Sequence, residues 1–268
     1  MLLKFDIPAN PTATTPIFSS DKKKLKARLP DEPAADIDLY RSAACSIMYN
    51  IQTTRVDAAY AANVCARYLS NPGQTHLEAV IRCLQYLNNT VNKQITYQPP
   101  TDPLMLHQLY AYTDASHQDH PETQKTTSGY VIYLNGGPIS WRVKLSTRVY
   151  KSPCHSEYNA LFETVNEIRA LRNLMTELGF EPHTATKIFE DNTGVIRVGN
   201  NPMAYDRMKG VETNEHIIRE AVERGEIVLE HVKSHDNVAD MLTKPLSEAL
   251  HTKHTNAVLQ QRPRANTF

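Results

Sequence analysis

The stretch "LHQLYAYTDASH", residues 106 to 117, reads as a β-strand that stops on an acid. Apolar and aromatic side chains recur from Leu109 to Tyr112, which is typical of a strand in a sheet core. Asp114 follows where the strand should still be buried, and two small residues come directly after it. Asp114 therefore has two interpretations. It belongs to a turn or cap, or it belongs to a site that acids from distant parts of the chain complete.

The residues after this strand alternate between strand and helix patterns. "TSGYVIYLNGGPISW" (127–141) predicts two strands in a hairpin across Asn135 and Gly136. The later pattern predicts a long helix over 156–179, strands over 185–192 and 227–235, and helices over 215–226 and 236–250. Pro245 must bend or break the last helix. An antiparallel start followed by crossovers gives an α/β fold, a mixed sheet with helices on its faces.

Two other segments precede this strand-and-helix region, which is predicted over 105–250. Residues 1 to 35 hold five prolines among polar residues, so a flexible linker with little packed structure is predicted. Residues 36 to 100 show helical spacing of apolar side chains and are predicted to be a small helical unit. Residues 251 to 268 are predicted to be a tail.

The composition is that of an ordinary soluble protein. The formal net charge is zero, so any binding to nucleic acid depends on local basic patches. The four cysteines form no C-x-x-C pair, which argues against a zinc site, and they are too few for a disulfide scaffold. No segment reaches the roughly 18 apolar residues of a membrane span, and no signal peptide is evident. An intracellular protein without a membrane partner is expected.

Three more acids lie at comparable places in the pattern. Glu157 is expected in the first turn of the long helix, Asp191 at the end of the next strand and Asp240 early in the last helix. Each alone could be a cap, a partner of a helix dipole or a solvated acid. At one edge of a sheet, however, carboxylates about 4 Å apart repel by about 4 kcal/mol. Such a group needs a cation, and oxygen ligands suit Mg²⁺ or Mn²⁺, two of which can promote phosphodiester hydrolysis.

These acids lie in a stretch that resembles the ribonuclease H domain of copia-type retrotransposon polyproteins. The resemblance covers about residues 108 to 250. It rests on motifs in the family's order: "YTDASHQDHPETQKTTSGYVIYLNGGPISW", "SEYNAL", "EDNTGVI", "NPMAYDRMKGVETNEHIIREAVERGEIVLEHV" and "NVADMLTKPL". Residues 39 to 87 resemble the segment that follows the polymerase core, the end of the reverse transcriptase.

The resemblance implies a ribonuclease H fold, a five-stranded mixed sheet with flanking helices, preceded by a small all-helical segment. It also implies that Asp114, Glu157, Asp191 and Asp240 are the catalytic, metal-binding acids, with two Mg²⁺ or Mn²⁺ ions as cofactor. The implied substrate is the RNA strand of an RNA–DNA hybrid, read mainly by shape, 2′-hydroxyls and phosphates. The parent polyprotein's reverse transcriptase core is an implied partner, in a cytoplasmic virus-like particle or the nucleus.

The chain also departs from the family. The polymerase signature Tyr-Val-Asp-Asp is absent, so no polymerase activity is expected of this chain. His155 stands where the family usually has Glu, and Gly210 where it usually has His. These changes favour a second hypothesis, an inactive or co-opted remnant that binds nucleic acid or protein. A third, integrase-like strand transfer, is disfavoured because that fold typically uses three acids and Asp240 supplies a fourth.

His235, in "HVKSHDN", is a further catalytic candidate. Cellular and retroviral ribonucleases H carry a mobile His shortly before their last acid, and such a His can move protons or help product leave. Copia-type sequences usually lack it, and surface histidines are common. A histidine with no catalytic role is therefore the alternative.

Overall fold

The computed structural model describes residues 2–21, 25–98, 106–200 and 212–261. The chain divides into two compact units: unit 2 comprises Tyr97–Lys244, and unit 1 combines Met1–Thr96 with Pro245–Phe268. The strand-and-helix region predicted over 105–250 thus ends at Lys244, because the helix that follows Pro245 packs in unit 1.

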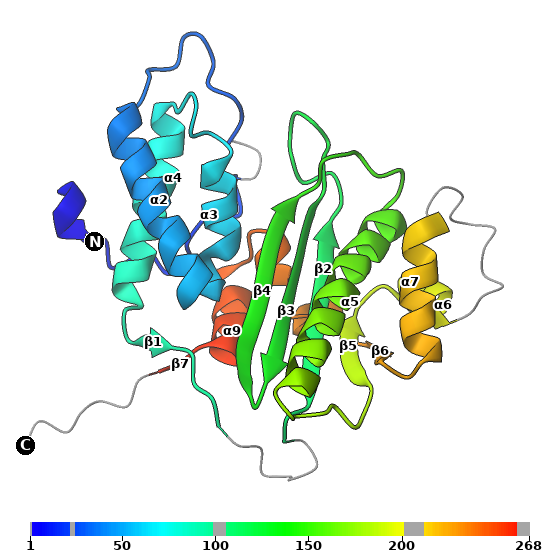
Figure 1. Ribbon diagram of the computed structural model, residues 1–268. Coiled ribbons are helices and arrows are strands. Elements are labelled where there is room, and N and C mark those ends of the chain that lie inside the picture. The colour runs from blue at the N-terminus through cyan, green and yellow to red at the C-terminus, as the bar shows by residue number, and fades with distance from the viewer. Residues whose placement is uncertain (1, 22–24, 99–105, 201–211, 262–268) are drawn as a thin grey trace, which may run out of the picture. The chain divides into compact units, whose positions relative to one another are not determined.

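A mixed five-stranded sheet organises unit 2 (Figure 1). Its strands are β2 (Leu109–Ser116), β3 (Thr127–Leu134), β4 (Gly137–Leu145), β5 (Thr186–Glu190) and β6 (Ile227–His231). The order is β4-β3-β2-β5-β6; β2, β3 and β4 are antiparallel, whereas β5 and β6 run parallel to β2. The predicted hairpin is confirmed, since Asn135 and Gly136 have φ of 49° and 77°, as a type I′ turn requires.

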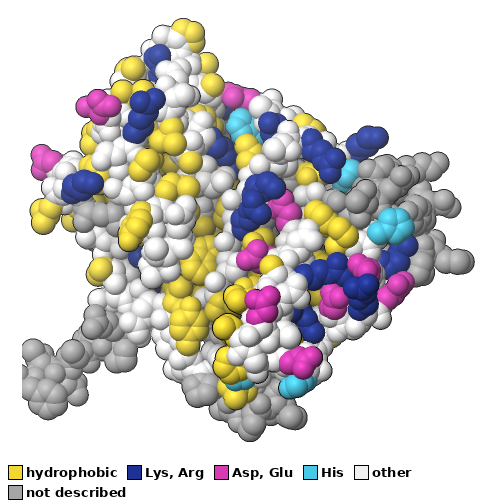
Figure 2. Space-filling model, in the orientation of Figure 1, with side chains coloured by type: hydrophobic (Ala, Val, Ile, Leu, Met, Phe, Trp, Pro, Cys, Tyr) yellow, Lys and Arg dark blue, Asp and Glu magenta, His cyan; other side chains and the backbone are white. Residues whose placement is uncertain are grey.

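Helices flank this sheet, which confirms the expected fold class. They are α5 (Pro153–Glu177), α6 (Thr193–Asn200), α7 (Glu212–Glu223) and the short α8 (Asp240–Thr243). Ser152 caps the start of α5, because its side chain accepts from the His155 N–H, and the helix ends before Gly179, whose φ is 83°. On the outer surfaces of α5 and α7, basic and acidic side chains lie interspersed (Figure 2), and Arg169 Nη2 of α5 lies 3.2 Å from Glu220 Oε2 of α7.

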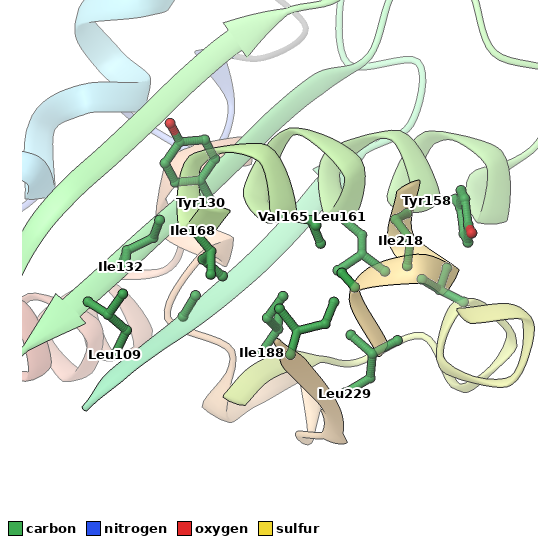
Figure 3. Close-up of a cluster of buried hydrophobic side chains, with 14 of the residues drawn as sticks. Leu109, Tyr130, Ile132, Tyr158, Leu161, Val165, Ile168, Ile188, Ile218 and Leu229 are labelled. Atoms are coloured by element: carbon green, nitrogen blue, oxygen red, sulfur yellow. The ribbon is translucent and has the colours of Figure 1, made fainter. Parts of the chain in front are cut away.

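Buried apolar side chains fill the space between α5 and the sheet (Figure 3). They include Leu109, Ala111, Tyr130, Ile132, Leu161, Val165, Ile168, Ile188, Ile218 and Leu229. Burying one such large side chain contributes about 1.5–3 kcal/mol, so this core holds the helices against the sheet. Because successive side chains of a strand alternate in direction, Asp114 lies on the opposite face of β2 from Ala111.

The short helix α8 packs on β2 and β3. A Cβ placed on Gly129 would meet Leu242 of α8, whereas the next residue, Tyr130, lies in the α5 core. Alternation therefore assigns α8 to the face that carries Asp114. The helix expected over 236–250 breaks at Pro245, as predicted.

Unit 1 is helical and uses both ends of the sequence. Its helices are α2 (Ile37–Thr53), α3 (Ala59–Ala66), α4 (Gln74–Asn89) and α9 (Glu248–Val258), with 3₁₀ turns η1 (Leu2–Phe5) and η2 (Val56–Ala58). Two short strands, β1 (Lys93–Gln94) and β7 (Gln260–Gln261), pair antiparallel.

Two expectations for unit 1 were wrong. Residues 1 to 35 are not simply a linker, because Ala13, Ile17 and Leu25 are buried and the Arg82 side chain donates to Thr15 Oγ1. Residues 251 to 268 are not simply a tail, because α9 extends to Val258, which is buried. In both cases apolar side chains cover helices that would otherwise expose apolar faces. Across the described ranges, no helix is long and apolar enough to cross a membrane.

Candidate active site

Three of the four predicted acids converge at one end of the sheet. Asp114, Glu157 and Asp191 each offer a carboxylate oxygen, and these three oxygens lie within 4.8 Å of one another. Asp114 lies near the end of β2, and Asp191 directly follows β5. Glu157 lies further into its helix than expected, because α5 begins at Pro153 and places it beyond the first turn. The group is thus built from two strand ends and a helix start.

Burial makes this group electrostatically costly. Asp114 is 1% exposed and Glu157 is 9% exposed. Burial raises the pKa of Glu157 well above its ordinary range, and the charges of Asp114, Glu190 and Asp191 raise it further. Among the described residues, the Glu157 Oε2 atom has no hydrogen-bond partner. Buried carboxylates this close together need protons or a cation.

The fourth acid, Asp240, is buried beside the group but is not one of the three. Its Oδ1 atom lies 2.7 Å from the Lys244 ammonium, which is also 3.7 Å from Asp114 Oδ2. Burial and the charge of Asp114 raise the pKa of Asp240 to about 7, although the Lys244 charge opposes the rise. Asp240 is therefore linked to Asp114 through a positive charge.

Sequence reasoning missed three residues at this site. Thr243 is fully buried and its hydroxyl donates to Asp114 Oδ2, and Lys244 follows it directly. Both stand in the quoted motif "NVADMLTKPL", and the i,i+4 spacing of Asp240 and Lys244 was an available signal. Glu190 precedes Asp191 and is fully buried; burial and the charges of Asp114 and Asp191 raise its pKa well above its ordinary range.

The segment before α8 is tied to the neighbouring strands. The Asn237 side chain is buried and donates to the Thr113 backbone oxygen at 2.9 Å. The Ser234 hydroxyl, in the 3₁₀ turn η5 (Ser234–Asp236), donates to Asp191 Oδ2. These bonds hold α8 next to β2 and the β5 end, so the site depends on the whole 234–244 segment.

His235 lies near the group but not in it. Its side chain is 64% exposed, and its Nε2 atom is 3.2 Å from Asp236 Oδ2. The neighbouring Ser234 contacts Asp191, so the turn that carries His235 reaches the edge of the site.

The departure from the family at His155 does not take part in the carboxylate group. His155 donates its backbone N–H to the Ser152 side chain, and its ring packs against Tyr150 with centroids 5.0 Å apart. It thus contributes to the start of α5 rather than to the acid group. Gly210 lies outside the described residues.

Comparisons with known proteins agree with the resemblance seen in the sequence, although no family model matches the chain. The Retrovirus-related Pol polyprotein from transposon RE1 of Arabidopsis thaliana is 35% identical over 234 residues, 87% of this chain. The corresponding polyprotein from transposon TNT 1-94 of Nicotiana tabacum is 35% identical over 205 residues, 76% of this chain. The chain spans about 15% of the length of each.

Among solved structures, LC11-RNase H1, isolated from compost, is similar in backbone, with a TM-score of 0.41 and 16% sequence identity. The match covers 52% of this chain and 94% of that chain. The sequence relationship identifies the family: over most of its length, this chain is a homologue of a short part of the retrovirus-related Pol polyproteins of plant transposons.

Proposed function

We propose that unit 2 is a metal-dependent endonuclease that cleaves the RNA strand of RNA–DNA hybrids. The observation that carries this proposal is the meeting of the Asp114, Glu157 and Asp191 carboxylates within 4.8 Å. The mixed sheet with flanking helices and the homology to Pol polyproteins support it. The proposal includes an intracellular setting, in a virus-like particle or the nucleus.

The residues present fit a hard divalent cation. All the donors are carboxylate oxygens, and the buried Glu157 Oε2 lacks a hydrogen-bond partner among the described residues. Asp114, Glu157 and Asp191 would hold one Mg²⁺ or Mn²⁺, and Asp240 with Asp114 are the acids available for a second. When bound, such ions make water a stronger nucleophile and stabilise charge on the leaving oxygen of a phosphodiester.

Other residues of the chain have supporting tasks in this proposal. Thr243 fixes the Asp114 carboxylate through its hydroxyl, and Ser234 does the same for Asp191. His235, on its exposed turn, is placed to exchange protons with solvent near the site. Arg148 and Lys151 are exposed in the loop before α5 and can contact phosphates of a hybrid.

Unit 1 is proposed to be the end of a reverse transcriptase region, without polymerase activity in this chain. Its partner would be a reverse transcriptase core from the parent polyprotein. A second candidate function, an inactive or co-opted module that binds nucleic acid or protein, is favoured by one observation. The Lys244 ammonium already neutralises part of the acid group without any metal.

Cleavage of a labelled RNA–DNA hybrid in Mg²⁺ or Mn²⁺ tests the proposal. The wild-type chain is compared with Asp114→Asn and with Glu230→Gln, which removes an acid of β6 that pairs with Lys187 on the sheet surface. Cleavage by the wild type and Glu230→Gln but not by Asp114→Asn is expected. Silence of all three folded proteins supports the second candidate, and cleavage by Asp114→Asn overturns the assignment of the site.

A further inference from the structure

A lysine, Lys244, lies between the carboxylates of Asp114 and Asp240. The Lys244 ammonium lies 2.7 Å from Asp240 Oδ1 and 3.7 Å from Asp114 Oδ2, and its side chain is 34% exposed. The Lys244 ammonium therefore forms ion pairs with both acids at the place where Asp114 and Asp240 approach each other.

This charge makes the two sides of the group unequal. On the Asp114–Asp240 side, one ammonium already offsets part of the charge of the two carboxylates. On the Asp114–Glu157–Asp191 side, the three oxygens are close together and Glu157 Oε2 has no hydrogen-bond partner within the described ranges. A divalent ion that approaches the first side meets the Lys244 ammonium directly, whereas on the second side only Asp114 has an ion pair with it among the described residues.

The backbone of Lys244 is held in place next to Thr243, whereas the end of its side chain is partly exposed to solvent. Thr243 is fully buried and its hydroxyl holds Asp114, so the lysine backbone starts from a fixed position. The Lys244 side chain is flexible and partly exposed, so its ammonium can move into solvent without unfolding α8.

We propose that Lys244 is a resident cation that takes the place of one of the two metal ions. A first divalent ion binds at Asp114, Glu157 and Asp191, and a second binds at Asp114 and Asp240 only when it displaces the Lys244 ammonium. The site therefore holds one ion at low metal concentration and two at high concentration. This inference rests on the proposed function, because it needs the acids to bind metal.

Calorimetric titration of the full chain with Mn²⁺ tests the displacement without measuring activity. The wild type is compared with Lys244→Met, with Lys244→Arg, which keeps the charge, and with Lys187→Met, which removes a surface lysine paired with Glu230. We expect one strong Mn²⁺ equivalent in the wild type and two in Lys244→Met, the second bound about tenfold or more tightly than in the wild type. Lys244→Arg and Lys187→Met are expected to titrate like the wild type.

The possible failures are distinguishable. If the wild type and Lys244→Met both bind Mn²⁺ with the same stoichiometry and affinities, the inference is overturned and the proposed function stands. If no folded variant binds Mn²⁺, the proposed function fails and the inference falls with it.

A second measurement requires no substitution and covers the case in which Lys244→Met does not fold. In wild-type chain with ¹³C-labelled lysine, the Lys244 Cε signal is followed during addition of Mg²⁺. A change that accompanies the second equivalent supports displacement. A change complete at the first equivalent, or no change at saturation, overturns it.

Discussion

Asp114 owes its position to a threonine far away in the sequence as much as to its own strand. The hydroxyl of Thr243, 129 residues later, donates to Asp114 Oδ2 in a fully buried environment. A hydrogen bond to a charged group contributes about 1.5–3 kcal/mol, and it also fixes which way the carboxylate points. The orientation of the acid is therefore sensitive to a residue that does not itself offer a carboxylate.

Replacing Thr243 with Val tests this positioning role. The variant keeps the side-chain shape and loses the hydroxyl, so we expect the free energy of unfolding to fall by about 2 kcal/mol and hybrid cleavage to fall about tenfold. Urea unfolding and kcat/KM measure the two effects. The matched control is Thr164→Val, which removes a buried hydroxyl that donates to the Ala160 carbonyl and lies 3.0 Å from the Thr113 hydroxyl. Equal losses of cleavage in both variants contradict a specific role for Thr243.

At this scale the sequence predicted the acids better than their partners. Asp114 and Asp191 could be found because an acid at the end of a buried strand departs from the apolar pattern. Glu190 carried the same signal as Asp191, and Lys244 had its i,i+4 spacing from Asp240, but a charged residue is ordinarily read as solvated, so both were missed. Lys244 becomes a partner of Asp114 only because α8 packs on β2, and this tertiary contact cannot be read from the local sequence.

At the scale of elements, the packing of α8 on β3 depends on a missing side chain. A Cβ on Gly129 would lie 2.7 Å from Leu242 Cβ and 3.1 Å from Thr243 Cγ2. Gly129 is also the direct partner of Asp114 across the β2–β3 pair. The absence of a side chain at this position lets α8 approach closely enough for Thr243 to reach the acid.

Gly129→Ala is therefore expected to push α8 away from the sheet. We expect a loss of about 1–3 kcal/mol in the free energy of unfolding and weaker Mn²⁺ binding, measured by urea unfolding and calorimetry. The comparison variant is Gly199→Ala, whose Cβ would lie 2.5 Å from Leu229 Cδ1 and 3.7 Å from Ile218 Cγ2 and would not meet α8. If Gly199→Ala weakens Mn²⁺ binding as much as Gly129→Ala does, the proposed role of the close approach is wrong.

A further prediction concerns the end of α5. Gly179 has a φ of 83°, and the Phe180 N–H donates to the Met175 carbonyl at 2.8 Å, which closes the helix. Gly179→Ala forces a side chain into the left-handed region, so we expect the free energy of unfolding to fall by about 1 kcal/mol. Hybrid cleavage should be unchanged, because Gly179 is at the opposite end of α5 from Glu157. A change in kcat/KM would contradict this separation.

Local patterns predicted these elements well where neighbours in sequence decide the structure. The Asn135–Gly136 hairpin and the break at Pro245 follow from backbone conformation alone. The first 35 residues were interpreted wrongly because composition cannot show that Ile17 and Leu25 have helices to pack on. Long-range burial overrides a polar, proline-rich composition there.

At the scale of the whole molecule, unit 1 has a buried charged network that responds to pH. Arg55 contacts Asp57 through Nε at 2.9 Å and Nη2 at 2.7 Å, and the His251 ring contacts the Asp57 carbonyl at 3.0 Å. Burial alone would raise the pKa of Asp57, but Arg55 and the Tyr86 hydroxyl hold it below its ordinary value. Burial lowers the pKa of His251, although the charge of Asp57 opposes this.

Both shifts predict a loss of stability in acid. Below about pH 6.5 the unfolded chain binds a proton at His251 that the folded chain does not, so the free energy of unfolding falls as pH falls. One such proton changes stability by up to about 1.4 kcal/mol per pH unit. His251→Gln should therefore flatten the dependence between pH 7 and 5, measured by urea unfolding with circular dichroism. Thr255→Val, which removes only the hydroxyl beside the ring, should keep the wild-type slope. Equal slopes in all three proteins would contradict the assignment.

The two ends of the sequence complete unit 1 together, and this has a consequence for synthesis on the ribosome. Residues 97–244 emerge before α9 does, so unit 2 can fold while α2, α3 and α4 still lack the helix that completes their unit. Domains fold as units during translation, and exposed apolar helix faces attract chaperones or aggregate. The growing chain is thus expected to need protection at α2, α3 and α4 until α9 leaves the exit tunnel.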